Sequence, residues 1–466
     1  MSDRYTLHVG DARAVLDTLP ADSFDAMLCD PPYGLSFMGK AWDHGVPSVD
    51  LWRAALRVLK PGAPLLAFGG TRTFHRLAVA IEDAGFEIRD TLCWMYGSGF
   101  PKSLDVSKAI DAAAGAEREV VGNYPVTREF KGRDLVGDQS HATRVDVTAP
   151  ATPLAAQWDG YGTSLKPAWE PCILARKPLD GTVAGTVAGN VWWWGVGGLA
   201  IDACRIGYES EDDMAAAAAA AAQRLGHPKH GAGVGDFGLH SVGAAASLQP
   251  YLDRQHLGRW PSNVILDEAA AAQLDAEAGE HPGMSGGGKH ASGYRGGMFG
   301  GIDSTATARG DSGGASRFFY CAKVSAAERE IGCEALPLRE FCQGYAGDVD
   351  ASPDRAGDLG LNRIKRIRNQ HPTLKPVALT RYLARLVLPP PGRERRIVVP
   401  FAGAGSEMIG ALLAGWEHVE GVELSEEYAT IARARLKVAI ERPGMFDAEA
   451  RATAVADDPR QGSLFG

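Results

Sequence analysis

Short apolar runs alternate with amphipathic helical patterns over the first hundred residues. The apolar runs predict strands, and the helical patterns between them end at Lys60-Pro61-Gly62 or at Gly85. Strands separated by short helices favour βαβ units and a mainly parallel sheet. The predicted strands are 5–9, 24–29, 63–68 and 88–94, and the predicted helices are 50–59 and 73–84.

The middle of the chain lacks this rhythm. Residues 97–168 show no regular pattern, and a strand is predicted next at 169–176. Eight consecutive alanines at 215–222 are expected to form an exposed helical segment or a spacer. Residues 283–314 contain 12 glycines, too many for the segment to bury an apolar core of its own, so a mobile loop is expected. A further strand is predicted at 317–323.

The most regular βαβ pattern lies near the end of the chain. A strand at 397–399 leads into a glycine turn, Phe401-Ala402-Gly403-Ala404-Gly405, which is followed by a helix at 407–414 and a strand at 418–422. Glu423 ends that strand 20 positions after Gly403, where an acid can bond both hydroxyls of a ribose. The third glycine of a dinucleotide motif would fall at Met408, so a nucleoside without pyrophosphate fits better. A plain structural turn is the alternative.

A second turn, Asp30-Pro31-Pro32-Tyr33, follows the strand at 24–29 and is here called the DPPY turn. Its prolines fix φ and lack N–H donors, so Asp30 and the Pro31 carbonyl present acceptors beside the flat ring of Tyr33. That combination suits an amino-bearing base taken out of its helix. A Pro-Pro turn with a surface tyrosine is the alternative, but ligands bind at the carboxyl ends of strands in open α/β sheets.

Composition narrows the class of protein. A chain of 466 residues with 45% hydrophobic and 23% charged residues is expected to fold, as two to three domains. We expect no membrane span and no export, because the sequence has neither a long apolar run nor an apolar signal core. Seven dispersed cysteines without a Cys-x-x-Cys pair indicate reduced thiols in the cytoplasm and no metal site.

The two turns together resemble the amino DNA methyltransferases, which methylate N6 of adenine or N4 of cytosine. Their order, with the DPPY turn first and the glycine turn last, resembles the permuted β group and its phage-type members. The resemblance implies an α/β class fold: a circularly permuted, Rossmann-like sheet that uses S-adenosyl-L-methionine, with a large irregular insert. It implies a catalytic part at 1–96, a target-recognition insert at 97–316 that contributes the strand at 169–176, a cofactor-binding part at 317–440 and a tail at 441–466.

The resemblance also implies roles for individual residues. The catalytic residues would be Asp30, Pro31, Pro32 and Tyr33, and the cofactor-binding residues would be Asp11, Lys375, Phe401, Gly403, Gly405 and Glu423. Lys375 belongs to the segment 371–376, which matches the one that opens the helix before the glycine turn. The glycine turn departs from the family, because Val399, Ala404, Ser406 and Glu407 stand where Asp, Ser, Thr and Thr are usual.

A basic segment precedes the glycine turn on a chain whose net charge is −9. Residues 362–396 contain ten Lys and Arg residues and one acid, a composition that suits DNA phosphates or a solvated helix face with a basic loop. The DNA-binding candidates are Arg363, Lys365, Arg366 and Arg368. Of Trp192-Trp193-Trp194, at most one indole is expected to be free to stack on a base. The segment 259–263 resembles a recurring phage-type segment and receives no role.

The resulting hypothesis is methyl transfer from S-adenosyl-L-methionine to adenine N6 in duplex DNA, with base flipping. Asp at the first position of the DPPY turn is typical of adenine enzymes and Ser of cytosine enzymes, which leaves cytosine N4 as the alternative. Further alternatives are methylation of RNA or of a protein glutamine, and a DNA-binding relative without activity. A homodimer and a restriction endonuclease partner stay open.

Overall fold

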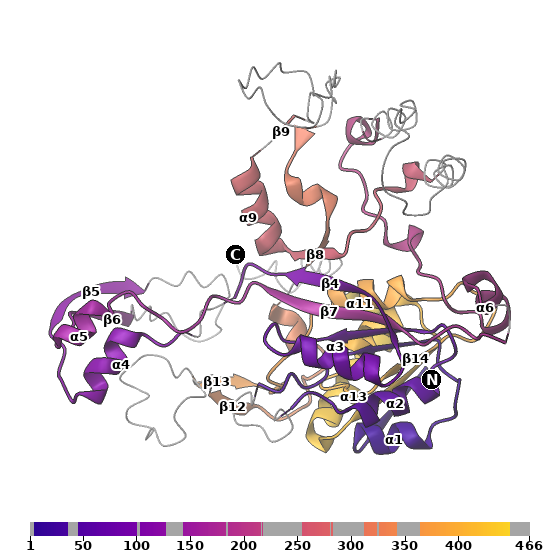
Figure 1. The fold of residues 1–466 in the computed structure, drawn as a ribbon, viewed down its shortest axis with the longest axis horizontal. Helices are drawn as coiled ribbons and strands as arrows, with labels where there is room; N and C mark the ends of the chain where they lie inside the picture. The colour runs from indigo at the N-terminus through magenta and orange to yellow at the C-terminus, as the bar shows by residue number, and fades with distance from the viewer. Residues whose placement is uncertain are drawn as a thin grey trace, which may run out of the picture.

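The structure is a computed structural model built around one large sheet (Figure 1). It describes residues 4–35, 45–99, 103–126, 143–182, 185–215, 217, 254–279, 281–282, 312–323, 326–342 and 364–447. The sheet has nine strands, and their order is β1 (Tyr5–Val9), β15 (His418–Glu423), β14 (Arg396–Val399), β2 (Ala26–Cys29), β3 (Pro64–Phe68), β7 (Trp169–Arg176), β4 (Glu87–Met95), β8 (Val264–Asp267) and β11 (Tyr320–Ala322).

All neighbouring strands of this sheet are parallel except β7, which is antiparallel to both β3 and β4. The C-terminal strands β14 and β15 lie between the N-terminal strands β1 and β2, so the two ends of the chain share one sheet. The predicted α/β class with a mainly parallel sheet is confirmed.

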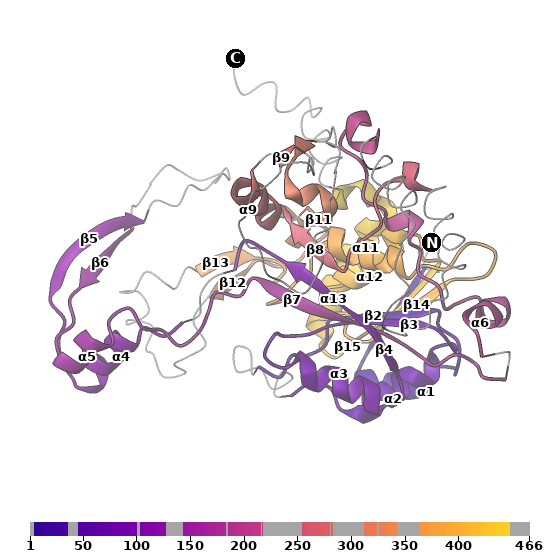
Figure 2. The same cartoon turned by 45° about the horizontal axis from the view of Figure 1, so that its top comes forward.

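Helices cover both faces of the sheet (Figure 2). One face carries α1 (Ala12–Thr18), α2 (Val49–Val58) and α3 (Phe74–Asp83), and the other carries α11 (Val377–Leu386), α12 (Ser406–Ala414) and α13 (Glu426–Glu441). Because side chains alternate along a strand, Leu65 packs with the first group of helices and Leu66 with the second. The sheet is therefore the middle layer of three.

The predicted boundaries needed small corrections. The strand predicted at 24–29 begins at Ala26, because Phe24 makes only an isolated bridge to Leu59. In the strand predicted at 317–323, a 3₁₀ turn at Ala315–Phe318 comes first, and β11 itself has three residues. The alanines at 216 and 218–222 and nearly all of 283–314 lie outside the described residues.

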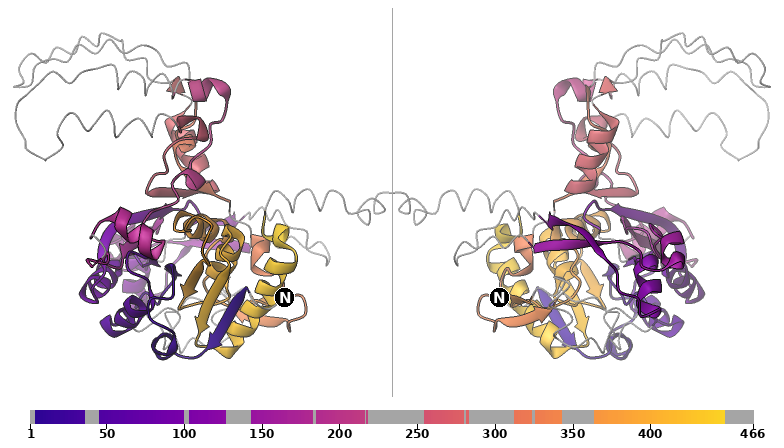
Figure 3. Two further views of the ribbon diagram at one scale, coloured as in Figure 1. Left: turned by 90° about the vertical axis from the view of Figure 1, so that its right-hand side faces the viewer. Right: turned by 90° about the vertical axis from the view of Figure 1, so that its left-hand side faces the viewer.

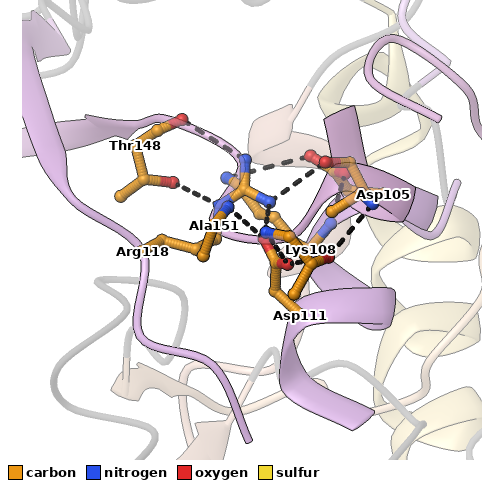
Figure 4. Close-up of polar contacts among 9 residues, drawn as sticks. Asp105, Lys108, Asp111, Arg118, Thr148 and Ala151 are labelled. Carbon is orange, nitrogen blue, oxygen red and sulfur yellow. Dashed lines mark hydrogen bonds and ion pairs between the residues drawn. The ribbon is translucent and has the colours of Figure 1, made fainter. Parts of the chain in front are cut away.

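A small module at 103–165 was not predicted, and it stands away from the sheet (Figures 1 and 2). It consists of α4 (Val106–Ala113), α5 (Pro153–Gln157) and a hairpin of β5 (Val120–Val126) with β6 (Thr143–Thr148). Its centre is the buried carboxylate of Asp111, which accepts hydrogen bonds from the Arg118 guanidinium at 2.7 Å and from the backbone N–H of Ala151 at 2.9 Å (Figure 4). The module, which we call the hairpin module, is thus held by a polar cluster.

The remaining described elements are short or lie at the periphery. The helix α9 projects from the body (Figures 1 and 3). These elements are α6 (Val187–Trp194), α9 (Glu268–Ala278), the pair β9 (His281–Pro282) and β10 (Ser312–Gly313), the pair β12 (Arg339–Cys342) and β13 (Ile364–Ile367), and 3₁₀ turns at Asp202–Cys204, Gln255–Leu257, Ala326–Arg329 and Pro443–Phe446. None of the helices in the described part of the chain has the length and apolar character needed to cross a membrane.

The tryptophan triplet ends α6 and differs from the prediction. Trp192 and Trp193 are 77% and 64% exposed, whereas Trp194 is half-buried and donates from Nε1 to Asp180 at 3.0 Å. Two indoles are exposed where at most one was expected, because α6 packs on the body through its other side. In the segment 259–263, Arg259 packs over the rings of Tyr208 and Phe318.

Candidate active site

Four parallel strands, β1, β15, β14 and β2, end at the same edge of the sheet. The chain leaves β14 toward β15 through α12 and leaves β2 toward β3 through α2, so the order reverses between β14 and β2. Such a reversal opens a crevice at the carboxyl ends, where open α/β sheets bind ligands. A cavity of about 980 Å³ lies there, lined by both the DPPY turn and the glycine turn.

The glycine turn bends sharply after β14. Gly403 and Gly405 have φ of 51° and 84°, in the left-handed region that favours glycine. The N–H of Ala402 donates to the Val422 carbonyl at 2.8 Å, which ties the turn to β15. Phe401 and Gly403 line the cavity. Gly405 does not line it, and instead begins α12, where a side chain would meet Ala432 of α13.

Glu423 and Asp11 lie beside the glycine turn and also line the cavity. The Glu423 carboxylate accepts hydrogen bonds from the backbone N–H groups of Gly403 and Ser425, both at 2.8 Å, and burial raises its pKa. The two carboxylate oxygens together can accept about four hydrogen bonds, so acceptor capacity remains for a ligand. Asp11 caps α1, accepting from the N–H of Ala14 at 3.0 Å.

A compact network of charged and polar groups holds the DPPY turn. Tyr33 donates from its hydroxyl to Asp30 at 2.7 Å and lies 3.1 Å from a Glu170 oxygen. The Lys375 ammonium donates to Asp30 at 2.7 Å and to the Tyr33 hydroxyl at 2.9 Å, and lies 3.2 Å from Glu170. Burial, Asp30 and Glu170 raise the pKa of Tyr33 well above its usual value, so the phenol stays protonated. Burial lowers the pKa of Lys375, but the two carboxylates outweigh it and keep the ammonium charged.

The structure brings together most of the predicted site residues and adds others. Lys375, expected beside the cofactor, has its ammonium on the DPPY turn. Glu170 was not predicted; β7 is antiparallel, so its first residues reach the carboxyl edge of the sheet. The sequence signal that could have identified Glu170 is an acidic residue at the start of a buried strand. Pro31 and Pro32 line the cavity as expected.

His371 closes the cavity over the glycine turn. Its Nδ1 donates to the Thr373 carbonyl, and its ring meets Tyr428 edge-on, with centroids 4.5 Å apart. A Cβ at Gly403 would lie 2.8 Å from Nε2, so only glycine fits beneath the imidazole. Burial lowers the pKa of His371 to about 4, so the ring is neutral near pH 7.

Glu407 is a second lining residue that was not assigned a role. Its side chain is 4% exposed, in the first turn of α12. Burial and the nearby Asp30 carboxylate raise its pKa to about 8.

The four DNA-binding candidates fare differently. Arg363 lies outside the described residues, and Lys365 lies in β13, where its side chain is not described. Arg366 is exposed. Arg368 is half-buried, and its backbone N–H donates to Glu330 at 3.0 Å. Of the four candidates, the structure therefore describes the side-chain exposure of Arg366 and Arg368 only.

No family model matches the chain. Among solved structures, it is similar to a candidate DNA modification methylase from Thermus thermophilus, at 14% identity over 94% of this chain and 96% of that one, with a TM-score of 0.32. It is also similar to the M1.HpyAVI–SAM complex, at 9% identity over 93% of this chain and 98% of that one, with a TM-score of 0.33. A third similar structure is the cytosine-N4-specific PvuII DNA methyltransferase, at 10% identity over 93% of this chain and 87% of that one, with a TM-score of 0.37.

Proposed function

We propose that this chain is a DNA methyltransferase that transfers a methyl group from S-adenosyl-L-methionine to N6 of a flipped adenine. One observation carries the proposal: a single cavity is lined by Asp30 and Tyr33 from one end of the chain and by Gly403 and Glu423 from the other. The first pair suits an amino-bearing base, and the second suits a nucleoside cofactor.

The residues of the glycine side fit the cofactor. Glu423 keeps acceptor capacity for ribose hydroxyls, and Gly403 exposes backbone to the cavity without a side chain. A volume of about 980 Å³ is at the upper end of the range for small-molecule pockets, which suits a cofactor with a base beside it. When bound, the cofactor supplies an electrophilic methyl group on a sulfonium. The altered residues of the turn leave its backbone geometry suited to this role.

Around the target base, the protein contributes groups that orient the amine and negative charge that stabilises it during attack. Asp30 and the Pro31 carbonyl would accept from the amine, and the Tyr33 ring would stack on the base. Two carboxylates, Asp30 and Glu170, face one ammonium, Lys375. This excess of negative charge favours the positive charge that develops on an attacking amine. No covalent intermediate with the enzyme is required.

The proposal separates binding from chemistry. Asp30→Ala should bind S-adenosyl-L-methionine nearly normally and lose methyl transfer by much more than about tenfold, because orientation and charge stabilisation are both removed. Glu423→Ala should weaken cofactor binding, because the ribose acceptors are removed. Calorimetry and transfer of labelled methyl groups to DNA measure the two effects. Asp50→Ala, an exposed acid that does not line the cavity, is the control.

An Asp30→Ala variant that keeps more than about a tenth of the rate would show that Asp30 does not hold the amine. The choice of adenine over cytosine depends on Asp at position 30. The larger ring of a purine also gives Tyr33 more area to stack on.

A further inference from the structure

Glu407 is a buried carboxyl group that the proposed methyl transfer does not use. It stands where the resembling family usually has threonine, it is 4% exposed, and it lines the cavity. Among the described residues, only its own backbone N–H is hydrogen bonded to the carboxylate. Burying a carboxyl group without strong partners is costly, so packing alone does not account for it.

Charged groups from several elements face Glu407. Asp30 ends β2, Lys375 precedes α11, and Arg435 comes from α13, where its guanidinium donates to the Ala404 carbonyl at 2.6 Å. Glu170 of β7 forms an ion pair with the same lysine, Lys375, at 3.2 Å. The buried thiol of Cys29 on β2 is also close, and its pKa is raised, so it is neutral.

These surroundings decide the charge of Glu407 before any ligand binds. Burial and Asp30 disfavour the carboxylate, whereas Lys375 and Arg435 favour it, and the pKa stands at about 8. The carboxyl group is therefore mostly protonated near pH 7, at a ratio of about ten to one. A cation placed in the cavity would shift this balance toward the carboxylate.

S-adenosyl-L-methionine brings such a cation, because its sulfonium is positive and the thioether of the product, S-adenosyl-L-homocysteine, is neutral. We propose that Glu407 is the counter-ion of the sulfonium cofactor: its carboxyl group releases a proton to solvent when S-adenosyl-L-methionine binds and regains one when the neutral product is present. This inference rests on the proposed function for the identity of the cofactor. It would make the site prefer the cofactor over the product that must leave.

Calorimetric titration in two buffers of different ionisation enthalpy counts the protons directly. The wild-type chain should release close to one proton per S-adenosyl-L-methionine near pH 7, and much less near pH 9, where the group is already ionised. S-adenosyl-L-homocysteine should release none from Glu407. Glu423 meets the same ribose in both ligands, so any proton it releases cancels in the difference.

Glu407→Gln should abolish the difference in proton release and reduce the preference for the cofactor over the product by about tenfold, equivalent to one unit of pKa. Glu407→Thr, which restores the usual residue, should behave in the same way and serves if the glutamine variant does not fold. The matched control is Glu426→Gln, an exposed acid in the first turn of α13.

A difference in proton release between the two ligands that persists in both Glu407 variants would overturn the inference, as would equal weakening of the binding of both ligands. A wild-type chain that binds S-adenosyl-L-methionine without releasing a proton would contradict this role and leave the proposed function standing. A wild-type chain that binds neither ligand would contradict the proposed function itself.

Discussion

At the residue scale, the DPPY turn depends on the buried ammonium group of Lys375. Its side chain is 6% exposed and contacts Asp30, Tyr33 and Glu170 together. Without that charge, two carboxylates would face each other across a phenol in a poorly hydrated site, and they would repel. Lys375 therefore holds Asp30 in the position that the proposed methyl transfer requires.

Replacing Lys375 by Met tests this positioning role. We expect kcat to fall by more than about tenfold while the affinity for S-adenosyl-L-methionine changes by less than about threefold, because the ammonium contacts the catalytic turn. Breaking a buried pair from one side also costs about 3–5 kcal/mol of stability, so rates are measured well below the melting temperature. Steady-state kinetics and calorimetry separate the two effects.

The control for this variant is Lys108→Met, which removes an ammonium that is 55% exposed and does not line the cavity. A Lys375→Met chain whose cofactor affinity falls as far as its kcat would instead favour the cofactor-binding role expected from the sequence.

At the scale of elements, the hairpin module has its own polar centre. Burial opposes ionisation of Asp111, but hydrogen bonds from Ala151 and Thr152 and the charge of Arg118 outweigh it, so its pKa is lowered. A lowered pKa in the folded state gives stability that is present above the unfolded value and disappears as the pH falls through the folded value. The module should therefore open in acid.

Hydrogen exchange followed by mass spectrometry tests this expectation. Amides of the module should lose protection below about pH 4, whereas the sheet keeps its protection at that pH. Asp111→Asn should reduce protection at neutral pH and flatten the pH dependence, because the carboxylate is gone. Asp146→Asn, on the exposed side of β6, is the control. The same acid response in Asp111→Asn and wild type would show that another group governs the module.

Local sequence patterns predicted which strands and turns form better than they predicted which strands lie next to each other in the sheet. Both turns, and all the parallel strands of the sheet except β8, follow from apolar runs and from turn residues within a few positions of one another. β8 was not predicted. The antiparallel orientation of β7 depends on pairing between segments that are distant in the sequence. The position of Glu170 in the cavity lining depends on the same pairing. The module was missed despite local signals: Thr152 caps α5, and Val145 and Val147 alternate with polar residues in β6. The exposure of Trp192 depends on which side of α6 meets the body.

At the scale of the whole molecule, the proposed function requires a chain of net charge −9 to bind a polyanion, DNA. The basic segment at 362–396 is the proposed contact with DNA phosphates. Reversing the charges of Arg363, Lys365 and Arg366 should weaken binding to all sequences. It should also flatten the dependence of log K on log salt by up to about one unit for each phosphate that is no longer neutralised.

Binding measured by anisotropy over a range of salt concentrations provides the slope. A matched variant that reverses Arg53, Arg89 and Arg433, all exposed by 42% or more, controls for the change in net charge. An unchanged slope in the first variant would place the DNA-binding surface elsewhere on the molecule.

The central claim is that two turns from opposite ends of the chain form one site of methyl transfer to DNA. The most direct measurement incubates the chain with methyl-labelled S-adenosyl-L-methionine and unmethylated genomic DNA, and then identifies the nucleosides by mass spectrometry. We predict labelled N6-methyladenine with the wild-type chain and none with Asp30→Ala. Labelled N4-methylcytosine would change only the target base. A wild-type chain that binds the cofactor and leaves no labelled nucleoside in the DNA would contradict the claim.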